Sequence, residues 1–330
     1  MPCRLTAASL PGRPANPAAQ GRGVLFAGSP YLSGGVCLSL QLIVNGISLG
    51  AVYALIAVGF ALVFSILKFS NFAHGGMISA AAYIAYFFYA SFETPPSLWV
   101  TLLFTAVVSL GVALLLDTLC YRRIRKNNSP NIYYFVASIT FAILIEQILT
   151  VFFGKTSYGF PGMFEVASVR LLGASFATMD LVVLAVSIAM LVVLMLLINR
   201  TKTGLAIRAV AINPGAARLM GINSGFIVLF TFALAGFLAG VSGTLLGIKY
   251  SVYPALGSSM MVKGFIASVI GGLGSLSGAI AAAILLGVIE MVSIYFLGSS
   301  VTPAILFGIM LVFLFLRPQG ISGKFAQDKV

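Results

Sequence analysis

The only histidine of this 330-residue chain, His74, lies at the edge of a long apolar stretch. Asn71 precedes it, and Gly75 and Gly76 follow it directly. Two adjacent glycines weaken a helix and free backbone carbonyls, which at membrane depth must be satisfied by protein or by water. One interpretation is a bend whose polar groups line a path for a polar solute. The alternative is that His74 caps a helix end and packs against its neighbour. A proton relay is disfavoured because position 76 carries no carboxylate.

Two acids, Glu146 and Glu290, also fall inside or near apolar stretches. A charge at the centre of a bilayer costs about 2.5 kcal/mol or more, so an acid in such a place needs a partner or a function. Either acid is a candidate for coupling transport to an ion. We favour the simpler hypothesis that both are hydrogen-bonded structural acids, neutral or paired.

A glycine-rich stretch, GGLGSLSG, occupies residues 271–278. Gly271, Gly272, Gly274 and Ser275 fit a break between two half-helices whose ends face a charged solute and gate its path. The alternative is that these glycines only allow helices to pack closely. Close packing is the role expected for four further glycines at three- and four-residue steps: Gly236, Gly240, Gly243 and Gly247.

The loop at 200–224 contains signals for two short helices. Asn213 is a good N-cap, Pro214 stands at the first helical position, and Gly221 provides a left-handed stop, which predicts a helix at 214–220. A second short helix is expected at 204–212. Two capped, basic, partly apolar helices exceed what a connector needs and indicate a docking element for a cytoplasmic partner. The alternative is a helix that lies on anionic lipid.

These segments belong to a chain that is 60% hydrophobic and only 8% charged, with a mean hydropathy of +1.09. Soluble domains are about one quarter charged, so the composition excludes a water-soluble enzyme. A membrane-spanning helix takes about 20 apolar residues, which leaves room for roughly eight or nine spans. The apolar runs are continuous rather than alternating, which argues against strands. They occupy residues 38–67, 72–92, 97–121, 131–153, 180–199, 225–247, 262–297 and 301–316.

We therefore predict an all-α, polytopic membrane protein with 8–10 transmembrane helices, at least one of them broken or re-entrant. The chain has 19 Lys and Arg against 7 Asp and Glu. In a membrane protein such an excess records orientation rather than nucleic-acid binding. Basic clusters at 122–126, 200–218 and 317–329 are expected at the cytoplasmic face. Residue 37 then lies outside, and the run 262–297 crosses twice or crosses once with a re-entrant half-helix.

Three parts are expected along the chain. Residues 1–36 form a disordered arm, or the native chain starts later, nearer Val24. Residues 37–323 form the transmembrane domain with the cytoplasmic loop 204–221, and residues 324–330 form a tail. The arm carries three arginines that the orientation places on the wrong side: Arg4, Arg13 and Arg22. A shorter native arm, or a re-entrant segment near 68–76, would remove this conflict.

Other sources of chemistry are absent from the sequence. Cys3, Cys37 and Cys120 are scattered and odd in number, which favours neither a disulfide framework nor a metal site. The tripeptide 154–156 ends like a phosphate-binding loop, but the glycine required five positions earlier is Leu149. We expect no cofactor, no metal, no nucleotide site and no enzymatic activity in this chain, so energy must come from a partner or an ion gradient.

Several motifs together resemble one family. AARLMG at 216–221 resembles the core of the coupling loop in permease subunits of binding-protein-dependent ABC importers. NGISLGAVYALIAVGFALVFSILKFSNFAHGG at 45–76 resembles the first span and the histidine signature of the high-affinity branched-chain amino acid permeases. Further similarity lies in YRRIR at 121–125, in VIGGLGSLSGAIAAAILLGVIE at 269–290 and in LRPQGI at 316–321. The resemblance runs from about residue 40 to residue 323. Two positions depart from it, since Gly215 and Gly76 stand where the family usually has glutamate.

The resemblance implies an inner-membrane permease subunit of an ATP-driven importer for branched-chain or related small amino acids or amides. Its implied partners are a second homologous permease, two cytoplasmic ATPases that bind the ATP, and an extracytoplasmic substrate-binding protein. The residues expected to couple to the ATPases are Arg208, Asn213, Pro214, Ala217, Arg218 and Gly221. Those expected to line or gate the path are Asn71, His74, Gly75, Gly271, Gly272, Gly274 and Ser275.

Two other functions stay open. An ion-driven secondary transporter would use Glu146, Glu290 and His74 as coupling groups and would not need the capped double helix. A permease of the same broad family could instead serve urea or a sugar. The substrate side chain stays undetermined, because in such importers the binding protein supplies most of the selectivity.

Overall fold

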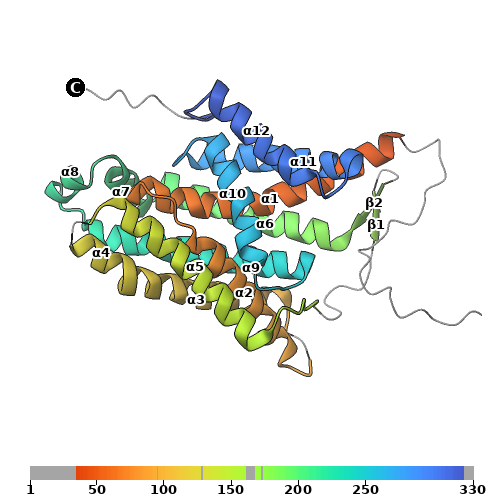
Figure 1. Cartoon of the computed structure of the whole chain (residues 1–330), viewed down its shortest axis with the longest axis horizontal. Helices are drawn as coiled ribbons and strands as arrows, with labels where there is room; N and C mark the ends of the chain where they lie inside the picture. The colour runs from red at the N-terminus through yellow and green to blue at the C-terminus, as the bar shows by residue number, and fades with distance from the viewer. Residues whose placement is uncertain (1–34, 95, 128, 161–167, 172–173, 323–330) are drawn as a thin grey trace, which may run out of the picture. The chain divides into compact units, whose positions relative to one another are not determined.

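The computed structural model describes residues 35–94, 96–127, 129–160, 168–171 and 174–322 (Figure 1). The predictions for the arm concern residues that lie almost wholly outside these ranges, and those for the tail lie outside them entirely. The longer helices are α1 (Gly35–Leu67), α2 (Ala73–Ala90), α3 (Leu98–Leu116), α5 (Asn131–Phe153), α6 (Thr178–Arg200), α9 (Ser224–Tyr250), α10 (Leu256–Gly271), α11 (Leu276–Leu297) and α12 (Thr302–Leu316). The shorter elements are a π-helical turn η1 (Asp117–Tyr121), α4 (Arg122–Lys126), α7 (Lys202–Ile212), α8 (Pro214–Leu219), and the strands β1 (Ser168–Leu171) and β2 (Ala174–Ala177).

Six helical segments in the described part of the chain are long and apolar enough to cross a membrane. They are Gln41–Leu67, Leu98–Lys126, Asn131–Phe153, Thr178–Arg200, Ser224–Tyr250 and Leu276–Leu297. The two shorter apolar helices α10 and α12, and the more polar α2, bring the described set to nine. The predicted all-α polytopic fold is confirmed.

The predicted break in the run 262–297 is confirmed. Helix α10 ends at Gly271 and α11 begins at Leu276. Between them Gly272 has φ +102° and Gly274 has φ +88°, a left-handed backbone that favours glycine. The Ser275 hydroxyl accepts the Gly278 N–H and caps α11. The run is therefore two helices rather than one long span.

The re-entrant segment considered near 68–76 stays a prediction, and the structure shows a turn between two helices here. Helix α1 continues to Leu67, a short turn follows, and α2 begins at Ala73. Lys68 has φ +56° and reverses the chain at this point. The side of the membrane on which the three arginines of the arm lie likewise stays a prediction.

Glycines bring the helices into backbone contact. Added Cβ atoms on Gly236 and Gly240 of α9 would collide with α3, and one on Gly243 would collide with α2. A Cβ on Gly247 would instead lie 3.0 Å from the Val252 Cγ2 and 3.2 Å from the Phe160 Cε2. The predicted role in close helix packing is confirmed for Gly236, Gly240 and Gly243, because a stripe of small residues lets helices approach closely.

The two ends of the bundle carry different structures. Figure 1 shows α4, α7 and α8 gathered at one end and the β1–β2 hairpin at the other. The basic clusters at 122–126 and 200–218 therefore share one end, as expected for the cytoplasmic face. The hairpin pairs Ser168 with Ala177 in antiparallel register. It was not predicted, because four-residue strands are too short to give an alternating pattern.

Candidate functional site

The cytoplasmic double helix, α7–α8 with the residues that cap it, has the predicted geometry. The Asn213 Oδ1 accepts the backbone N–H groups of Gly215 and Ala216 at 2.9 and 3.0 Å, and Pro214 begins α8. Gly221 has φ +82° and ends it. Helix α7 begins at Lys202, where the Thr201 hydroxyl accepts the Gly204 N–H at 3.1 Å. Both helices are thus fixed at their N-termini by side-chain caps.

The cytoplasmic double helix has an inner and an outer face. Gly204, Ile207 and Val210 of α7 and Ala217 of α8 are buried against the bundle. The outer side exposes Arg208 and four apolar side chains. These apolar side chains are Leu205, Ile212, Leu219 and Met220, exposed by 61%, 86%, 90% and 83%. A rigid surface that exposes both apolar and basic groups is suited to docking.

One contact ties the double helix to a transmembrane helix. The Arg218 Nε donates to the Ser224 hydroxyl at 3.2 Å, and Ser224 is the first residue of α9. The Asn223 Oδ1 caps the same helix through the Phe226 N–H at 3.1 Å. The side chain of Arg218 thus joins α8 to the start of α9.

His74 and its neighbours lie in tight packing. The His74 side chain is fully buried against Gly59 of α1, and neither ring nitrogen has a hydrogen-bond partner in the described part of the chain. Asn71 accepts a hydrogen bond from the Tyr121 hydroxyl at 2.9 Å. A Cβ on Gly76 would lie 2.9 Å from the Ala142 Cα of α5. This packing leaves no room at position 76 for the glutamate that the resemblance leads one to expect.

The 271–275 turn is held by the C-terminal segment. The Ile321 N–H donates to the Ile270 carbonyl at 2.9 Å, and the Ser322 N–H donates to the Gly271 carbonyl at 3.1 Å. A Cβ on Gly320 would lie 2.3 Å from the Gly272 Cα. Gly272 therefore serves both the turn and the close approach of the chain end.

Three polar side chains meet within the membrane-spanning region. The Lys263 Nζ of α10 lies 2.5 Å from the Glu290 Oε1 of α11 and donates to the Tyr53 hydroxyl of α1 at 2.9 Å. The Tyr53 hydroxyl in turn donates to the Glu290 Oε2 at 2.9 Å. We call these residues the charged triad. Sequence reasoning found Glu290 but missed Lys263, whose signal is a lone lysine within an apolar helix.

Both intramembrane acids have partners, as predicted. Glu290 is paired in the charged triad, and the Glu146 Oε2 accepts a hydrogen bond from the Ser258 hydroxyl at 3.0 Å. A carboxylate with such partners is tolerated in a membrane protein because its desolvation is partly compensated. The hydrogen-bonding prediction for Glu146 and Glu290 is confirmed.

Further polar groups adjoin the charged triad. Lys249 at the end of α9 pairs with Asp180 of α6 at 2.6 Å. The partly exposed Tyr250 follows it, and the Lys249 Nζ lies 6.0 Å from the centroid of the Tyr250 ring. Tyr253 and Ser259 share a hydrogen bond of 3.2 Å between their hydroxyls. We call these neighbouring groups the polar lane, defined by Asp180, Lys249, Tyr250, Tyr253 and Ser259.

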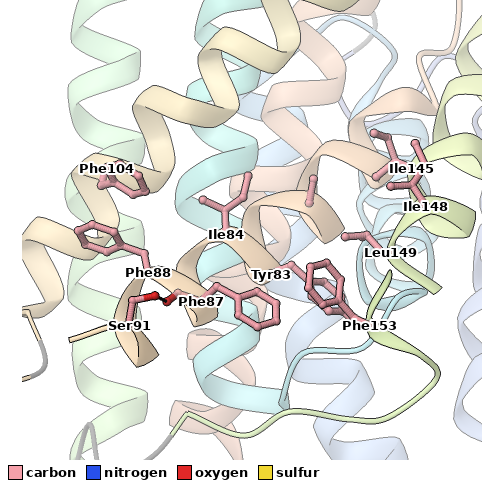
Figure 2. A pocket seen from close by; sticks show the side chains of 11 residues that line it. Tyr83, Ile84, Phe87, Phe88, Ser91, Phe104, Ile145, Ile148, Leu149 and Phe153 are labelled. Atoms are coloured by element: carbon pink, nitrogen blue, oxygen red, sulfur yellow. Dashed lines mark hydrogen bonds between the residues drawn. The ribbon is translucent and has the colours of Figure 1, made fainter. Parts of the chain in front are cut away.

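A separate apolar pocket of about 530 Å³ lies between α2, α3 and α5. Figure 2 shows Phe88 of α2 facing Phe104 of α3 across one side of it, with ring centroids 4.0 Å apart. Phe87 and Phe153 line the other side of the pocket, and their ring centroids are 4.5 Å apart. No charged side chain lines this pocket, so it does not suit a charged solute.

The fold and these sites define a polytopic membrane transport protein. Comparison with known families makes the assignment specific: residues 42–315 match the family described as "Branched-chain amino acid transport system / permease component", and the chain belongs to it. It is a multi-pass permease subunit of an ABC import system of the inner membrane.

Curated relatives match over most of their lengths. The chain is 30% identical to the high-affinity branched-chain amino acid transport system permease protein LivH of Salmonella typhimurium, over 88% of this chain and 97% of that protein. It is 30% identical to the permease protein BraD of Pseudomonas aeruginosa, over 88% and 98%. The probable LivH of Methanocaldococcus jannaschii is 30% identical over 82% and 88%. The arm and the tail fall outside the residues matched by the family.

Proposed function

We propose that this chain forms one half of the membrane pore of an ATP-driven importer for branched-chain amino acids or related small amino acids. The observation that carries the proposal is the cytoplasmic double helix, which is capped at both helices and presents a basic and apolar outer face. The names of the relatives, as branched-chain amino acid permeases, support the substrate class.

The double helix is the proposed docking site for a cytoplasmic ATPase. Arg208 and Arg218 supply charge, whereas Asn213, Pro214 and Gly221 set the backbone. Ala217 is buried, so its role is to seat α8 on the bundle. The Arg218–Ser224 contact would pass the movement of the ATPase to α9, and the α9 glycines would pass it on to α2 and α3.

The proposed partners are two cytoplasmic ATPases, an extracytoplasmic substrate-binding protein and a second homologous permease. The ATP is bound by the ATPases and not by this chain. An ABC system needs both an energy source and a pore, and this chain supplies the membrane helices for the pore.

Asn71, His74, Gly75, Gly271, Gly272, Gly274 and Ser275 are the proposed gate of the path. Gly75 of α2 meets the backbone of α10 at Gly257, and Gly272 meets the backbone of Gly320. Five of these seven residues are buried, and Gly274 and Ser275 are partly buried, which fits a closed gate that would open when α2 and α10 move apart.

The test is reconstitution of the chain with candidate ATPases and binding protein, followed by ATP hydrolysis and leucine uptake. Arg218→Glu and Gly221→Pro should each lower uptake by about tenfold, since a reversed charge and a broken helix end both remove docking geometry. Arg123→Glu, an exposed charge at the same end but outside the double helix, is the matched control and should stay within about twofold.

Two results would contradict the proposal. Uptake driven by a proton or sodium gradient without ATPases would make the chain a secondary transporter, with Glu146, Glu290 and His74 as the residues to study. ATP-driven uptake of urea or a sugar, but of no amino acid, would retain the ABC mechanism and overturn the substrate class.

A further inference from the structure

The charged triad forms a closed ring of interactions. Each oxygen of Glu290 has one partner, Lys263 for Oε1 and Tyr53 for Oε2, and Lys263 also contacts Tyr53. Tyr53 lies near the middle of the Gln41–Leu67 span, so the triad lies at depth in the membrane. An ammonium, a carboxylate and a phenol are therefore held together where single charges are costly.

Stability alone does not explain an ion pair at this depth. Removing two charges from water costs several kcal/mol per ion, and apolar residues of similar volume pack as well or better. The ion pair joins α10 to α11, and these two helices also meet in backbone contact where Gly271 approaches Gly278. The pair is thus a costly feature that the packing of α10 on α11 does not require.

The ring is accessible from one side. The Lys263 side chain is 22% exposed, whereas the Glu290 side chain is 6% exposed. On the same helix as Lys263 is the exposed Ser259, whose hydroxyl bonds to Tyr253. The polar lane therefore adjoins the accessible side of the triad and provides hydroxyl groups for a solute that approaches it.

We propose that the charged triad is a binding site for the two charged ends of a zwitterionic amino acid within the path. The substrate carboxylate takes the place of Glu290 on Lys263 and Tyr53, and the substrate ammonium takes the place of Lys263 on Glu290. This inference rests on the proposed function and adds to it the site that binds the two charged ends of the substrate. No bond forms or breaks, because only hydrogen bonds and ion pairs are exchanged.

Charge balance explains which solutes the triad accepts. A zwitterion satisfies both Lys263 and Glu290, whereas a solute with one charge leaves one of them unpaired in a poorly solvated place. A neutral solute such as urea or a sugar offers neither an ammonium nor a carboxylate. The triad therefore selects for the amino acid backbone and leaves the choice of side chain to other parts of the system.

One other ion pair of the described residues, Asp117 with Arg125, is placed differently. Asp117 and Arg125 lie on one continuous helical segment, next to the cytoplasmic end. Their side chains are 1% and 23% exposed, which closely matches the 6% and 22% of Glu290 and Lys263. They supply a control pair of equal burial that joins no separate helices.

The experiment uses the complete complex in proteoliposomes with ATPases and binding protein. Its variant is the double substitution Lys263→Met with Glu290→Gln, which leaves no buried charge unpaired. Leucine uptake should fall about tenfold or more, because both charged contacts to the substrate are lost. Stimulation of ATP hydrolysis by the binding protein should stay within about twofold, because the docking surface is untouched.

The control is Asp117→Asn with Arg125→Gln, for which both readouts should stay within about twofold. Uptake by the triad variant within twofold of the unsubstituted complex would overturn the inference and make the ion pair purely structural. An equal loss in both double variants would overturn it as well. Failure of the proposed function would be visible in the unsubstituted complex, whereas failure of this inference is visible only in the variants.

A second measurement does not depend on turnover in the double variant. Ser259→Cys, one helical turn before Lys263 on α10, is placed in a chain whose three native cysteines are changed to serine, and a membrane-impermeant, positively charged methanethiosulfonate is added during ATP cycling. The thiol should react, and saturating leucine should slow its reaction severalfold, because bound substrate covers it. A thiol that stays unreactive, or that leucine does not protect, would overturn the inference.

Discussion

Substitution of Gly287 by alanine tests how closely α1 and α11 must approach. A Cβ on Gly287 would lie 2.3 Å from the Gly50 nitrogen and 2.4 Å from the Gly46 carbonyl oxygen. Ordinary contacts of a Cβ begin at 3.4 Å, so the two helices must separate locally by about 1 Å. The opposing atoms are backbone and cannot rotate away. Overpacking of this kind costs about 1–3 kcal/mol, and we expect the upper half of that range.

The same separation reaches the charged triad. Tyr53 follows Gly50 by three residues on α1, and Glu290 follows Gly287 by three residues on α11, so each pair shares a helix face. Moving the helices apart by about 1 Å would stretch the 2.9 Å bond from Tyr53 to Glu290 beyond hydrogen-bond length. Gly287→Ala should therefore lower uptake as well as stability.

The purified chain is heated in detergent, and the fraction that stays monodisperse is measured at each temperature. The thermal midpoint is the temperature at which half of the protein has been lost. A loss of about 2–3 kcal/mol should lower the midpoint by about 5 °C or more. Gly308→Ala in α12 is the control, because a Cβ at that position meets nothing within 4 Å. Equal midpoints for Gly287→Ala and Gly308→Ala would refute the argument that this crossing depends on backbone contact.

Three further outcomes are expected. Asn213→Ala removes the cap of α8, which should cost about 1 kcal/mol of helix stability and lower ATP-driven uptake about threefold; unchanged uptake would contradict a docking role. Gly221→Ala meets no steric contact but strains a left-handed backbone by about 1 kcal/mol, so Gly221→Asn should lower uptake less than Gly221→Ala does. His74→Met replaces an unpartnered buried imidazole and should raise the thermal midpoint of the purified chain by a few degrees, about 1 kcal/mol. Leucine uptake by the same variant should fall if His74 lines the path, and unchanged uptake would leave it a packing residue.

The elements of this protein were largely predictable from local sequence. Continuous apolar runs indicated the membrane helices, since a bilayer demands about 20 apolar residues from each crossing. The cap at Asn213, Pro214 at the start of α8 and Gly221 at its end predicted the cytoplasmic double helix, because capping depends on residues within one turn. Local chemistry also placed the break at 271–275.

The short outer strands and the contacts of each glycine were not predictable. A glycine at position 76 reads only as a weak helix former, whereas the structure places the Ala142 backbone 2.9 Å from its missing Cβ. Which helix faces a glycine depends on the packing of the whole bundle and leaves no trace in the residues next to it.

The sequence by itself determined the class of fold and the double helix α7–α8, because hydropathy and capping act within short stretches of chain. The orientation, inferred from charge bias, stays a prediction. Only the tertiary structure identified the residues with which Glu290 pairs. Its partner Lys263 is 27 residues away and its partner Tyr53 is 237 residues away. An ion pair forms where three separate helices meet, and the approach of those helices is set by close packing along their full lengths.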